Sequence, residues 1–578
     1  MRLGEALKIT GKSAAGPPRS IHLLCGFTPL HLETFIKARV MARLPASDVL
    51  VLTGLFDDLE GNLQRASQKA AEGAIAVIEW SDLDRRLGFR ASAGWSTAAL
   101  VDIAAQVQEA CSRLIPYFEE LQQQMPVVLV PPTLALLPLT HLPPSQTDQF
   151  ELDLQAVLAN FLQDLGRSGI RVIGSALLAT TSPPALRQDL RMELLAGFPY
   201  TVPHADAVAE LSVQCLFPEA PRKGLITDLD QTLWKGILGD VGTDGVSWSL
   251  EAKSQEHALY QQLLASLADS GSLIAIASKN DAELVSQALL RGDLLISPAQ
   301  IFPVEANWGP KSHSVERILK TWNIGADSVV FVDDSPLELA EVAERFPVME
   351  CLQFPSGDAT ALLLLLRQLR ARFGKSEVRE EDRLRLGSIR DAAGLHKQAG
   401  DRVSGDFLSR LEAKVKIEPA GVDSRAFELV NKTNQFNLNG ITFTEAEWKS
   451  KAERIGAFLF SVTYEDRFGP LGRIAVIGGI RDGSRYVVDT WVLSCRAFSR
   501  QIEHQSIRQL FAATSALEVR FLYKPTGRNG PTKTFFEEFF PSAAVYEGAL
   551  DLSASWFEEK CPVLYHQVTN KWITSELE

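Results

Sequence analysis

The chain has 578 residues, 46% of them hydrophobic and 22% charged, which is typical of a well-packed globular protein with about three to four domains. Its 58 lysine and arginine residues stand against 71 aspartate and glutamate residues, and the net charge of -13 disfavours nucleic acid and anionic membranes as partners. No stretch reaches the roughly 18 apolar residues of a membrane span, residues 1–18 lack the apolar core of a signal peptide, and the six cysteines show neither a CxxC pair nor disulfide density, so we expect a cytoplasmic protein.

Residues 1–215 alternate short apolar runs with longer helical patterns. This alternation predicts an α/β domain in which a parallel sheet is covered on both faces. The domain shows no clear Gly-Asp-Ser block that would mark a serine nucleophile, so we expect it to act as a scaffold or docking domain. The expected strands are IHLLCGF from Ile21, DVLVLTG from Asp48, AIAVIEW from Ala74, PVVLVPP from Pro126 and RVIGSAL from Arg171.

The most informative segment is KGLITDLDQT, residues 223–232, where a short apolar run ends in two carboxylates and a threonine. An extended chain places Asp228 and Asp230 on the same side, at the point where a buried parallel strand gives way to a loop. Two acids in this position indicate a site for magnesium and a phosphoryl group.

Three later segments complete such a site. Residues 273–280, LIAIASKN, form a second apolar run that ends near Ser278, and Lys311 in NWGPKS supplies a fixed cation. Residues 329–335, VVFVDDS, form a third run that ends in Asp333 and Asp334. Phosphoryl transfer needs a nucleophile, a hard cation held by carboxylates, and donor groups around the phosphoryl oxygens, and these segments offer each of them.

In content and order, these segments resemble the haloacid dehalogenase (HAD) phosphatases. The resemblance implies that Asp228 attacks phosphorus to form an aspartyl-phosphate, while Asp230 protonates the leaving group and then activates water. It also implies a Mg2+ cofactor held by Asp228, Asp230, Asp333 and Asp334. The residues expected to bind the substrate and its phosphate are Thr232, Ser278, Lys279, Asn280 and Lys311.

The spacing of these motifs bears on access to the site. The intervals from Asp228 to Ser278 and on to Lys311 leave room for a helix and a loop, but not for a large inserted cap domain. We therefore expect residues 216–373 to form a HAD-like Rossmannoid core with an open site. Such a site suits a macromolecular substrate, or one covered by another domain, because bulk water must be excluded from the phosphoryl group.

After a charged segment predicted as a helical connector, residues 374–410, the pattern changes to strands with fewer and shorter helices. Residues 411–578 resemble a GCN5-related N-acyltransferase (GNAT) domain, an α+β fold. That family binds the pyrophosphate of coenzyme A in a glycine-rich loop, but here Ser499 and Gln501 stand at the glycine positions, so a pantetheine arm is expected instead. The segments that carry this resemblance are KTNQFNLNG, RFGPLGRIAVIGG, VVDTWVLSCRAFSRQIE and YKPTGRNGPTKTFFEEFFP.

The order DLDQTLWKGILGDVG, connector, NKTNQFNLNG, SCRAFSR resembles the FkbH-like family over about residues 216–550. The resemblance implies an enzyme that takes the glyceryl group of 1,3-bisphosphoglycerate, removes its phosphates and loads it onto the phosphopantetheine of an acyl carrier protein for polyketide-type biosynthesis. Residues 1–215 look like the degenerate SGNH-hydrolase-like domain often found ahead of this core. Cys495 would capture the acyl group, with Arg496 stabilising its thiolate and binding substrate.

Several readings stay open. Cys495 is a catalytic thiol or a small buried apolar residue, and Asn434 and Asn437 orient a polyol substrate or fix a turn through side-chain hydrogen bonds. For the whole chain, the alternatives are a plain phosphatase whose GNAT-like domain recruits a partner, and an acyltransferase that acts on a sugar or an amine.

Overall fold

The computed structural model divides into two compact units, Met1–Glu219 with Thr444–Ser450, and Ala220–Phe443 with Lys451–Glu578. Among the residues that it describes, every helix is too short or too polar to cross a lipid bilayer. Residues 391–407 of the predicted connector lie outside them. The structure describes residues 1–11, 18–44, 48–91, 97–143, 145–380, 382–387, 389–390, 408–409, 411–467, 469–482, 485–494, 497, 500–541, 545 and 547–571.

The first unit is built on a five-stranded parallel sheet of order β2-β1-β3-β4-β5. The five apolar runs of the sequence form these five strands, as predicted. The side chains of β3 and β4 are buried along their whole length, as expected of strands covered on both faces. The strands are β1 (Pro18–Leu24), β2 (Asp48–Thr53), β3 (Ala74–Val77), β4 (Val127–Val130) and β5 (Arg171–Val172).

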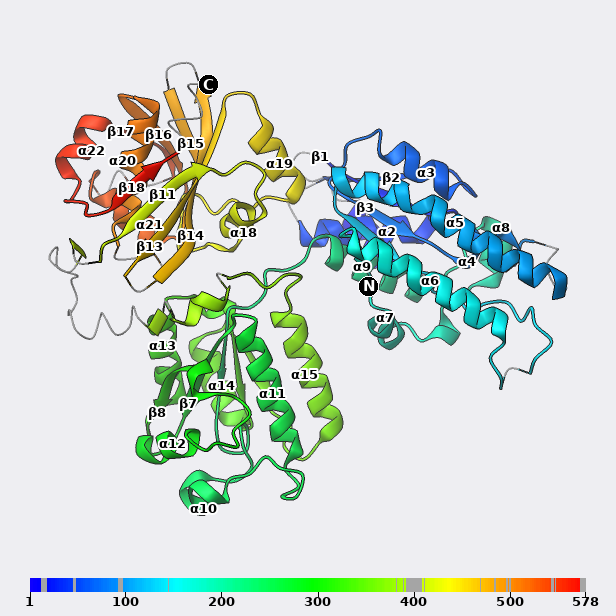
Figure 1. Cartoon of the computed structure of the whole chain (residues 1–578), viewed down its shortest axis with the longest axis horizontal. Helices are drawn as coiled ribbons and strands as arrows, with labels where there is room; N and C mark the ends of the chain where they lie inside the picture. Colours follow the sequence, from blue (N-terminus) through cyan, green and yellow to red (C-terminus); the bar gives the residue numbers. More distant parts are fainter. Residues whose placement is uncertain are drawn as a thin grey trace. The chain divides into compact units, whose positions relative to one another are not determined.

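Helices cover both faces of this sheet (Figure 1). One apolar cluster joins the sheet to α1, α2 and α9, and a second joins it to α3, α5 and α6. The helices are α1 (Leu3–Thr10), α2 (Leu30–Arg43), α3 (Leu59–Ala66), α4 (Trp80–Leu83), α5 (Thr97–Gln124), α6 (Gln149–Arg167), α7 (Ser175–Thr181), α8 (Leu190–Ala196) and α9 (Val202–Leu216), with 3-10 turns at Arg85–Leu87 and Pro184–Leu186.

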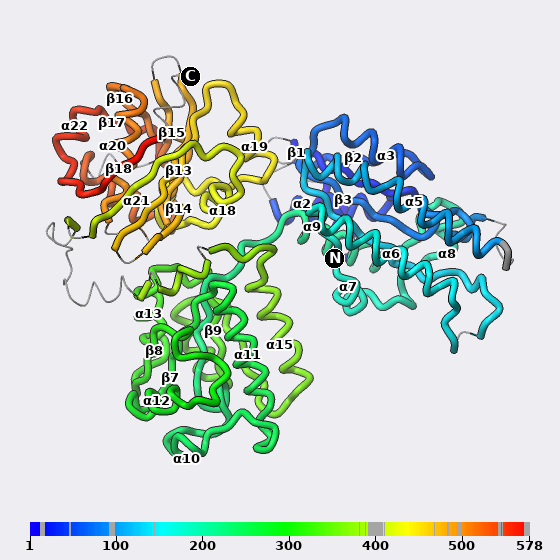
Figure 2. The backbone as a smooth tube through the Cα atoms, in the orientation of Figure 1, coloured from blue at the N-terminus to red at the C-terminus, as the bar shows by residue number. Residues whose placement is uncertain are grey.

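The second unit opens with another parallel sheet, of order β10-β9-β6-β7-β8, in which β6 lies between β9 and β7. Every side chain of β6, β7 and β9 is buried. In the backbone trace, β7, β8 and β9 run between α11 and α13 (Figure 2). The strands are β6 (Gly224–Thr227), β7 (Leu273–Ser278), β8 (Ile301–Ala306), β9 (Val329–Asp333) and β10 (Glu350–Gln353).

Two apolar clusters again lie on the two faces, one with α11, α12 and α15 and the other with α13 and α14. Between β6 and α11, residues 228–254 contain one short helix, α10, and two isolated bridges, so no large cap is inserted there. The helices are α10 (Leu238–Gly245), α11 (Gln255–Asp269), α12 (Ala282–Leu289), α13 (Lys311–Trp322), α14 (Pro336–Arg345) and α15 (Ala359–Phe373), with 3-10 turns at Pro298–Gln300 and Ala326–Ser328.

The rest of the second unit is an α+β structure around a mixed sheet of order β17-β16-β15-β14-β13-β11-β18, with β12 also paired to β15. The pairs β15–β16 and β11–β18 are parallel and the others antiparallel. The strands are β11 (Lys414–Pro419), β12 (Phe436–Asn437), β13 (Ala457–Asp466), β14 (Gly469–Asp482), β15 (Arg485–Leu493), β16 (Glu518–Tyr523), β17 (Gly548–Ser553) and β18 (Gln567–Asn570). The helices are α18 (Ser424–Lys432), α20 (Ile502–Thr514), α21 (Gly530–Glu537) and α22 (Ala554–Lys560), and α19 (Glu445–Glu453) belongs to the first unit as far as Ser450.

Candidate active site

Three neighbouring strands deliver polar side chains to one edge of the second parallel sheet. Asp228 follows the last residue of β6, Ser278 ends β7 and Asp333 ends β9. Because β6 pairs in parallel with both β7 and β9, the carboxyl ends of all three strands meet at this edge. All four residues of β6 are buried, so the first polar side chain after them stands where the strand ends. The position of Asp228 at the edge of the sheet therefore follows from the apolar run.

Lys311, the first residue of α13, joins the acids of two strands. Its Nζ atom lies 2.9 Å from Oδ1 of Asp228 and 2.5 Å from Oδ2 of Asp333, and all three side chains are buried. Burial opposes protonation of Lys311, but the two carboxylates outweigh this effect and raise its pKa. The structure therefore brings together three of the elements that the sequence placed far apart.

Asp228, Asp333 and Asp334 form a group whose ligand oxygens all lie within 4.8 Å of one another. Burial raises the pKa of each of these carboxyl groups, and Asp333 adds to the effect on Asp228. Oδ1 of Asp228 is buried and lies beside the Lys311 ammonium group. Three hard oxygen donors, with Lys311 as the cation between them, leave an excess of negative charge, and this donor set fits a magnesium ion.

Asp230 does not belong to that group, so its carboxylate does not match the metal role expected from the sequence. Its Oδ1 atom accepts hydrogen bonds from Trp234 Nε1 at 2.9 Å and from the Leu238 amide at 3.1 Å, and Oδ2 accepts one from Asn280 Nδ2 at 2.9 Å. These three donors hold the carboxylate in one orientation, which suits a group that transfers a proton.

Trp234 also belongs to this site, although the sequence motifs did not predict a role for it. Its side chain is fully buried while its indole N–H reaches Asp230. A buried indole needs a hydrogen-bond acceptor, and the spacing of four residues in DLDQTLW is a signal from which this contact could have been expected.

The expected substrate-binding residues divide into two sets. Ser278 and Asn280 are buried at the end of β7, where Asn280 Nδ2 also donates to Ser278 Oγ over 3.3 Å. Thr232 is fully buried, and its hydroxyl accepts from the Asp334 amide over 3.1 Å, so it ties two loops together. Lys279 pairs with Glu338 of α14 at 2.8 Å, and its expected contact with phosphate stays a prediction.

In the α+β part, Cys495 and Arg496 lie outside the described residues, so their expected roles stay predictions. Asn437 is buried, donates from Nδ2 to the Thr433 carbonyl at 2.9 Å, and accepts at Oδ1 from the amides of Asn439 and Gly440. These hydrogen bonds favour the turn interpretation of Asn437, and its substrate-binding role stays a prediction. Asn434 lines a cavity.

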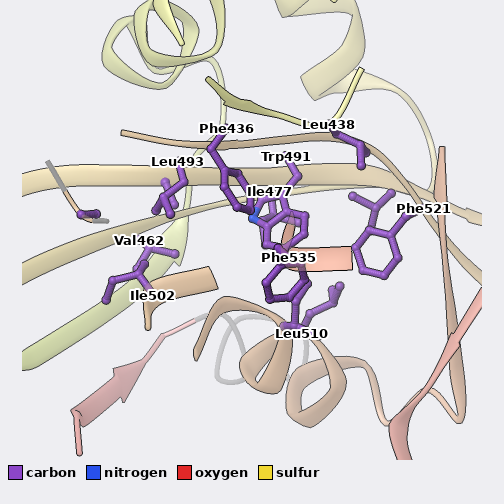
Figure 3. Packing of buried hydrophobic residues seen from close by; sticks show 14 of the residues in the cluster. Phe436, Leu438, Val462, Ile477, Trp491, Leu493, Ile502, Leu510, Phe521 and Phe535 are labelled. Atoms are coloured by element: carbon purple, nitrogen blue, oxygen red, sulfur yellow. The ribbon is translucent and has the colours of Figure 1, made fainter. Parts of the chain in front are cut away.

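The segment around β12 occupies the space beside β15. Phe436 pairs with Leu493, the amide of Leu438 donates to the Trp491 carbonyl at 2.9 Å, and the amide of Lys524 donates to the Leu438 carbonyl at 3.1 Å. Figure 3 shows Phe436 and Leu438 in the apolar cluster that also contains Trp491. Residues 436–438 thus bridge β15 and the end of β16 where these two strands no longer pair directly.

The first unit has a cavity of about 310 Å3 at the carboxyl ends of its strands. Glu79 borders it and accepts hydrogen bonds from Tyr200 and Thr133, both over 2.6 Å. Thr133 Oγ1 lies 2.9 Å from His204 Nε2, and His204 Nδ1 lies 2.9 Å from Ser182 Oγ. Burial lowers the pKa of His204 to about 3, so the imidazole is neutral. Ser182 is buried as well, and the scaffold role expected for this domain stays a prediction.

Comparison with known proteins adds a likeness of fold. No family model matches the sequence, and no curated protein matches it. The structure is similar to that of the N-terminal part of BF1531 from Bacteroides fragilis, described as containing a phosphatase domain complexed with Mg, with 18% identity, coverage of 65% of this chain and 100% of that chain, and a TM-score of 0.50. An uncharacterized protein from Corynebacterium glutamicum aligns with 17% identity over 27% of this chain and 98% of its own, with a TM-score of 0.19. The first likeness shows a shared fold over 65% of the chain.

Proposed function

We propose that the chain is a Mg2+-dependent phosphatase of the HAD type whose nucleophile is Asp228. The observation that carries this proposal is the gathering of Asp228, Asp333 and Lys311 within ion-pair distance at the ends of two neighbouring parallel strands. The likeness to a phosphatase-domain protein crystallised with Mg supports the same reading.

The chemistry follows from the two first acids. A carboxylate oxygen of Asp228 attacks phosphorus, the bond from phosphorus to the ester oxygen breaks, and Asp230 gives its proton to the leaving alkoxide. Water then attacks the phosphorus of the aspartyl-phosphate, Asp230 takes the proton of that water, and inorganic phosphate leaves with Asp228 regenerated. Lys311 neutralises charge on the transferring group. Asp228, Asp333 and Asp334 would hold Mg2+, which would offset the repulsion between the carboxylate of Asp228 and the phosphate anion.

The finer proposal is that the phosphate belongs to 1,3-bisphosphoglycerate and that the glyceryl group passes to an acyl carrier protein. The resemblance to the FkbH-like family supports it, and the absence of an inserted cap in residues 228–254 agrees with a large acceptor. The acyl phosphate of this substrate is already activated toward thiols, whereas its phosphate ester needs a catalyst. Cys495 would capture the acyl group before its transfer to the pantetheine thiol.

One assay tests both levels of the proposal. The purified chain is incubated with Mg2+, 1,3-bisphosphoglycerate and a panel of pantetheinylated carrier proteins, and the enzyme and carriers are weighed by intact-protein mass spectrometry. A glyceryl adduct on a carrier supports the transferase. Release of phosphate without any adduct supports the plain phosphatase, and no release from the ester, with Asp228→Asn as the reference, rejects both.

A further inference from the structure

A second cavity lies in the same compact unit as the Asp228 site, at the opposite edge of the same parallel sheet. Its volume is about 280 Å3, and one wall is formed by residues that precede β6 and β9 and by Leu273, which begins β7. Residues of α18, the turn after it and the end of β15 form another. Lys223 borders the cavity while Asp228 follows the far end of β6, a distance of roughly 17 Å for about five extended residues. A ligand in this cavity therefore does not contact the phosphatase site.

The lining is strongly basic in a chain that is acidic as a whole. Seven lysine and arginine residues border the cavity, against the two carboxylates Asp327 and Glu428. Asp327 pairs with Arg528 at 2.5 Å, and Glu428 pairs with Arg425 at 2.8 Å and with Lys432. Two further acids outside the lining pair with other cations of the set. Among the described residues, the seven cations outnumber these four acids.

Lys375 shows the electrostatic effect of this excess. Its side chain is 7% exposed and pairs with Asp382 at 3.0 Å, which in turn pairs with Arg385 at 2.9 Å. Burial, followed by repulsion from Arg385, lowers the pKa of Lys375 to about 8 despite this partner, and Lys432 adds to the effect. A buried cluster of like charges destabilises the fold, and an anion in the cavity would offset that cost.

The same cavity contains the motif residues that the sequence singled out. Thr433, Asn434 and Gln435 line it, and they offer hydroxyl and amide groups beside the cations. Leu493, which ends β15, and Ser494, which follows it and precedes Cys495 in the sequence, line it as well. The lining therefore combines basic and polar groups, and it includes the two residues that directly precede Cys495 in the sequence.

We propose that this cavity is a second anion site of the chain and that it binds a phosphate ester during acyl transfer. The identity of the ester rests on the proposed function, which offers two sources of this chemistry, the phosphopantetheine arm of the carrier and the phosphorylated three-carbon acid. The Asp228 site removes phosphate at one edge of the sheet, and the cavity retains a phosphate-bearing ligand at the other.

The test uses the full chain with Asp228→Asn, in buffer with EDTA, so that the phosphatase site neither turns over nor holds metal. Isothermal titration calorimetry compares 4′-phosphopantetheine with pantetheine, and 3-phosphoglycerate with glycerate. We expect at least one phosphate ester to bind and its phosphate-free partner to bind at least about tenfold more weakly, because charge-assisted hydrogen bonds are the strong ones. Binding of 4′-phosphopantetheine alone assigns the site to the carrier arm, and binding of 3-phosphoglycerate alone assigns it to the acid.

Two variants locate the binding. Lys375→Gln removes a buried cation, and Arg528→Gln removes one whose side chain is 55% exposed and can be lost without unfolding. Each should weaken binding of the phosphate ester at least about fivefold. The control Arg520→Gln, which breaks an exposed ion pair with Asp551 between β16 and β17, should leave the affinity unchanged. Equal binding in Arg528→Gln, or no binding of either ester, overturns the proposal. Hydrolysis of p-nitrophenyl phosphate by the chain with native Asp228 tests the phosphatase separately.

Discussion

Asn280 donates a hydrogen bond from Nδ2 to Oδ2 of Asp230 over 2.9 Å, which links the end of β7 to the loop after β6. Asn280 is buried, and its bond restricts rotation of the carboxylate that is proposed to transfer protons. It acts through Asp230 and is therefore a positioning residue, not a catalytic one.

Asn280→Ala should lower kcat for p-nitrophenyl phosphate by about 10- to 100-fold, since a displaced proton donor loses most of its contribution to catalysis. KM should change by less than about threefold, because Lys311, the proposed phosphate-binding group, is not altered. Steady-state kinetics check this split, with Gln287→Ala on the exposed side of α12 as the control. A rise in KM at constant kcat would show instead that Asn280 binds substrate directly.

A trapping experiment should distinguish the roles of Asp228 and Asp230. An aryl phosphate with a good leaving group needs little proton donation, so Asp230→Asn should still form the aspartyl-phosphate but hydrolyse it slowly. Acid-quenched intact-protein mass spectrometry should detect a phosphorylated Asp230→Asn chain and an unmodified Asp228→Asn chain. Phosphorylation of Asp228→Asn would exclude Asp228 as the nucleophile.

The acidic group should bind Mg2+ with a readout other than activity. Because Asp228, Asp333 and Asp334 converge only in the folded chain, Mg2+ should stabilise the second unit against unfolding. At a concentration 100 times Kd the free energy of unfolding should rise by about 2.7 kcal/mol, and the thermal unfolding midpoint should rise with it. Asp333→Asn should abolish the shift, and EDTA should abolish phosphatase activity. Asp240→Asn, an exposed acid of α10, is the matched control; a full shift in Asp333→Asn would place the metal elsewhere.

The positions of the main acids could be predicted from the sequence because each strand of a parallel sheet, and therefore its end, can be recognised from its own apolar run. Buried runs before Asp228, Ser278 and Asp333 could each be recognised without knowing their neighbours, and parallel pairing brings their ends to one edge. The same reasoning identified all five strands of the first unit.

The exceptions are side chains whose partners come from another loop. Lys279 follows a strand end as Ser278 does, yet it pairs with Glu338, and the Thr232 hydroxyl meets the amide of Asp334. Such contacts depend on the distance between two loops, and the sequence of one loop alone does not predict that distance. The cavity opposite the Asp228 site could not be predicted for the same reason, because its cations come from several distant segments.

The segment at β12 should matter for stability. Phe436 packs against Trp491 with ring centroids 4.9 Å apart, so Phe436→Ala should destabilise the second unit by about 3–5 kcal/mol. Asn437→Ala leaves two amides without an acceptor and should cost about 1–3 kcal/mol. Thermal unfolding measures both, with Asn434→Ala in the same loop as the control. An unchanged unfolding midpoint for Asn437→Ala, together with a raised KM, would indicate that Asn437 binds substrate and does not stabilise the turn.

His504 should make the second unit more stable at neutral than at alkaline pH. Its ring is buried, with Nε2 2.8 Å from Glu538 and Nδ1 3.7 Å from Glu503. Burial opposes protonation, but the two carboxylates outweigh it and raise the pKa of His504 from 6.5 to about 9. The folded chain thus holds this proton more tightly than the unfolded chain does. The resulting stabilisation is complete below pH 6.5 and disappears as the pH rises through about 9.

The difference in unfolding midpoint between the parent and His504→Gln isolates this contribution, since all other groups titrate alike in the two chains. We expect the parent to be more stable by about 1–2 kcal/mol at pH 6.5, a value reduced for the exposure of Glu538, and the gap to close toward about pH 9. Glu538→Gln should shrink the gap and move its closure to lower pH, because one of the two charges that hold the proton is removed. A gap that is constant across this range would mean that His504 stabilises the fold by packing against Phe535 and not by its charge.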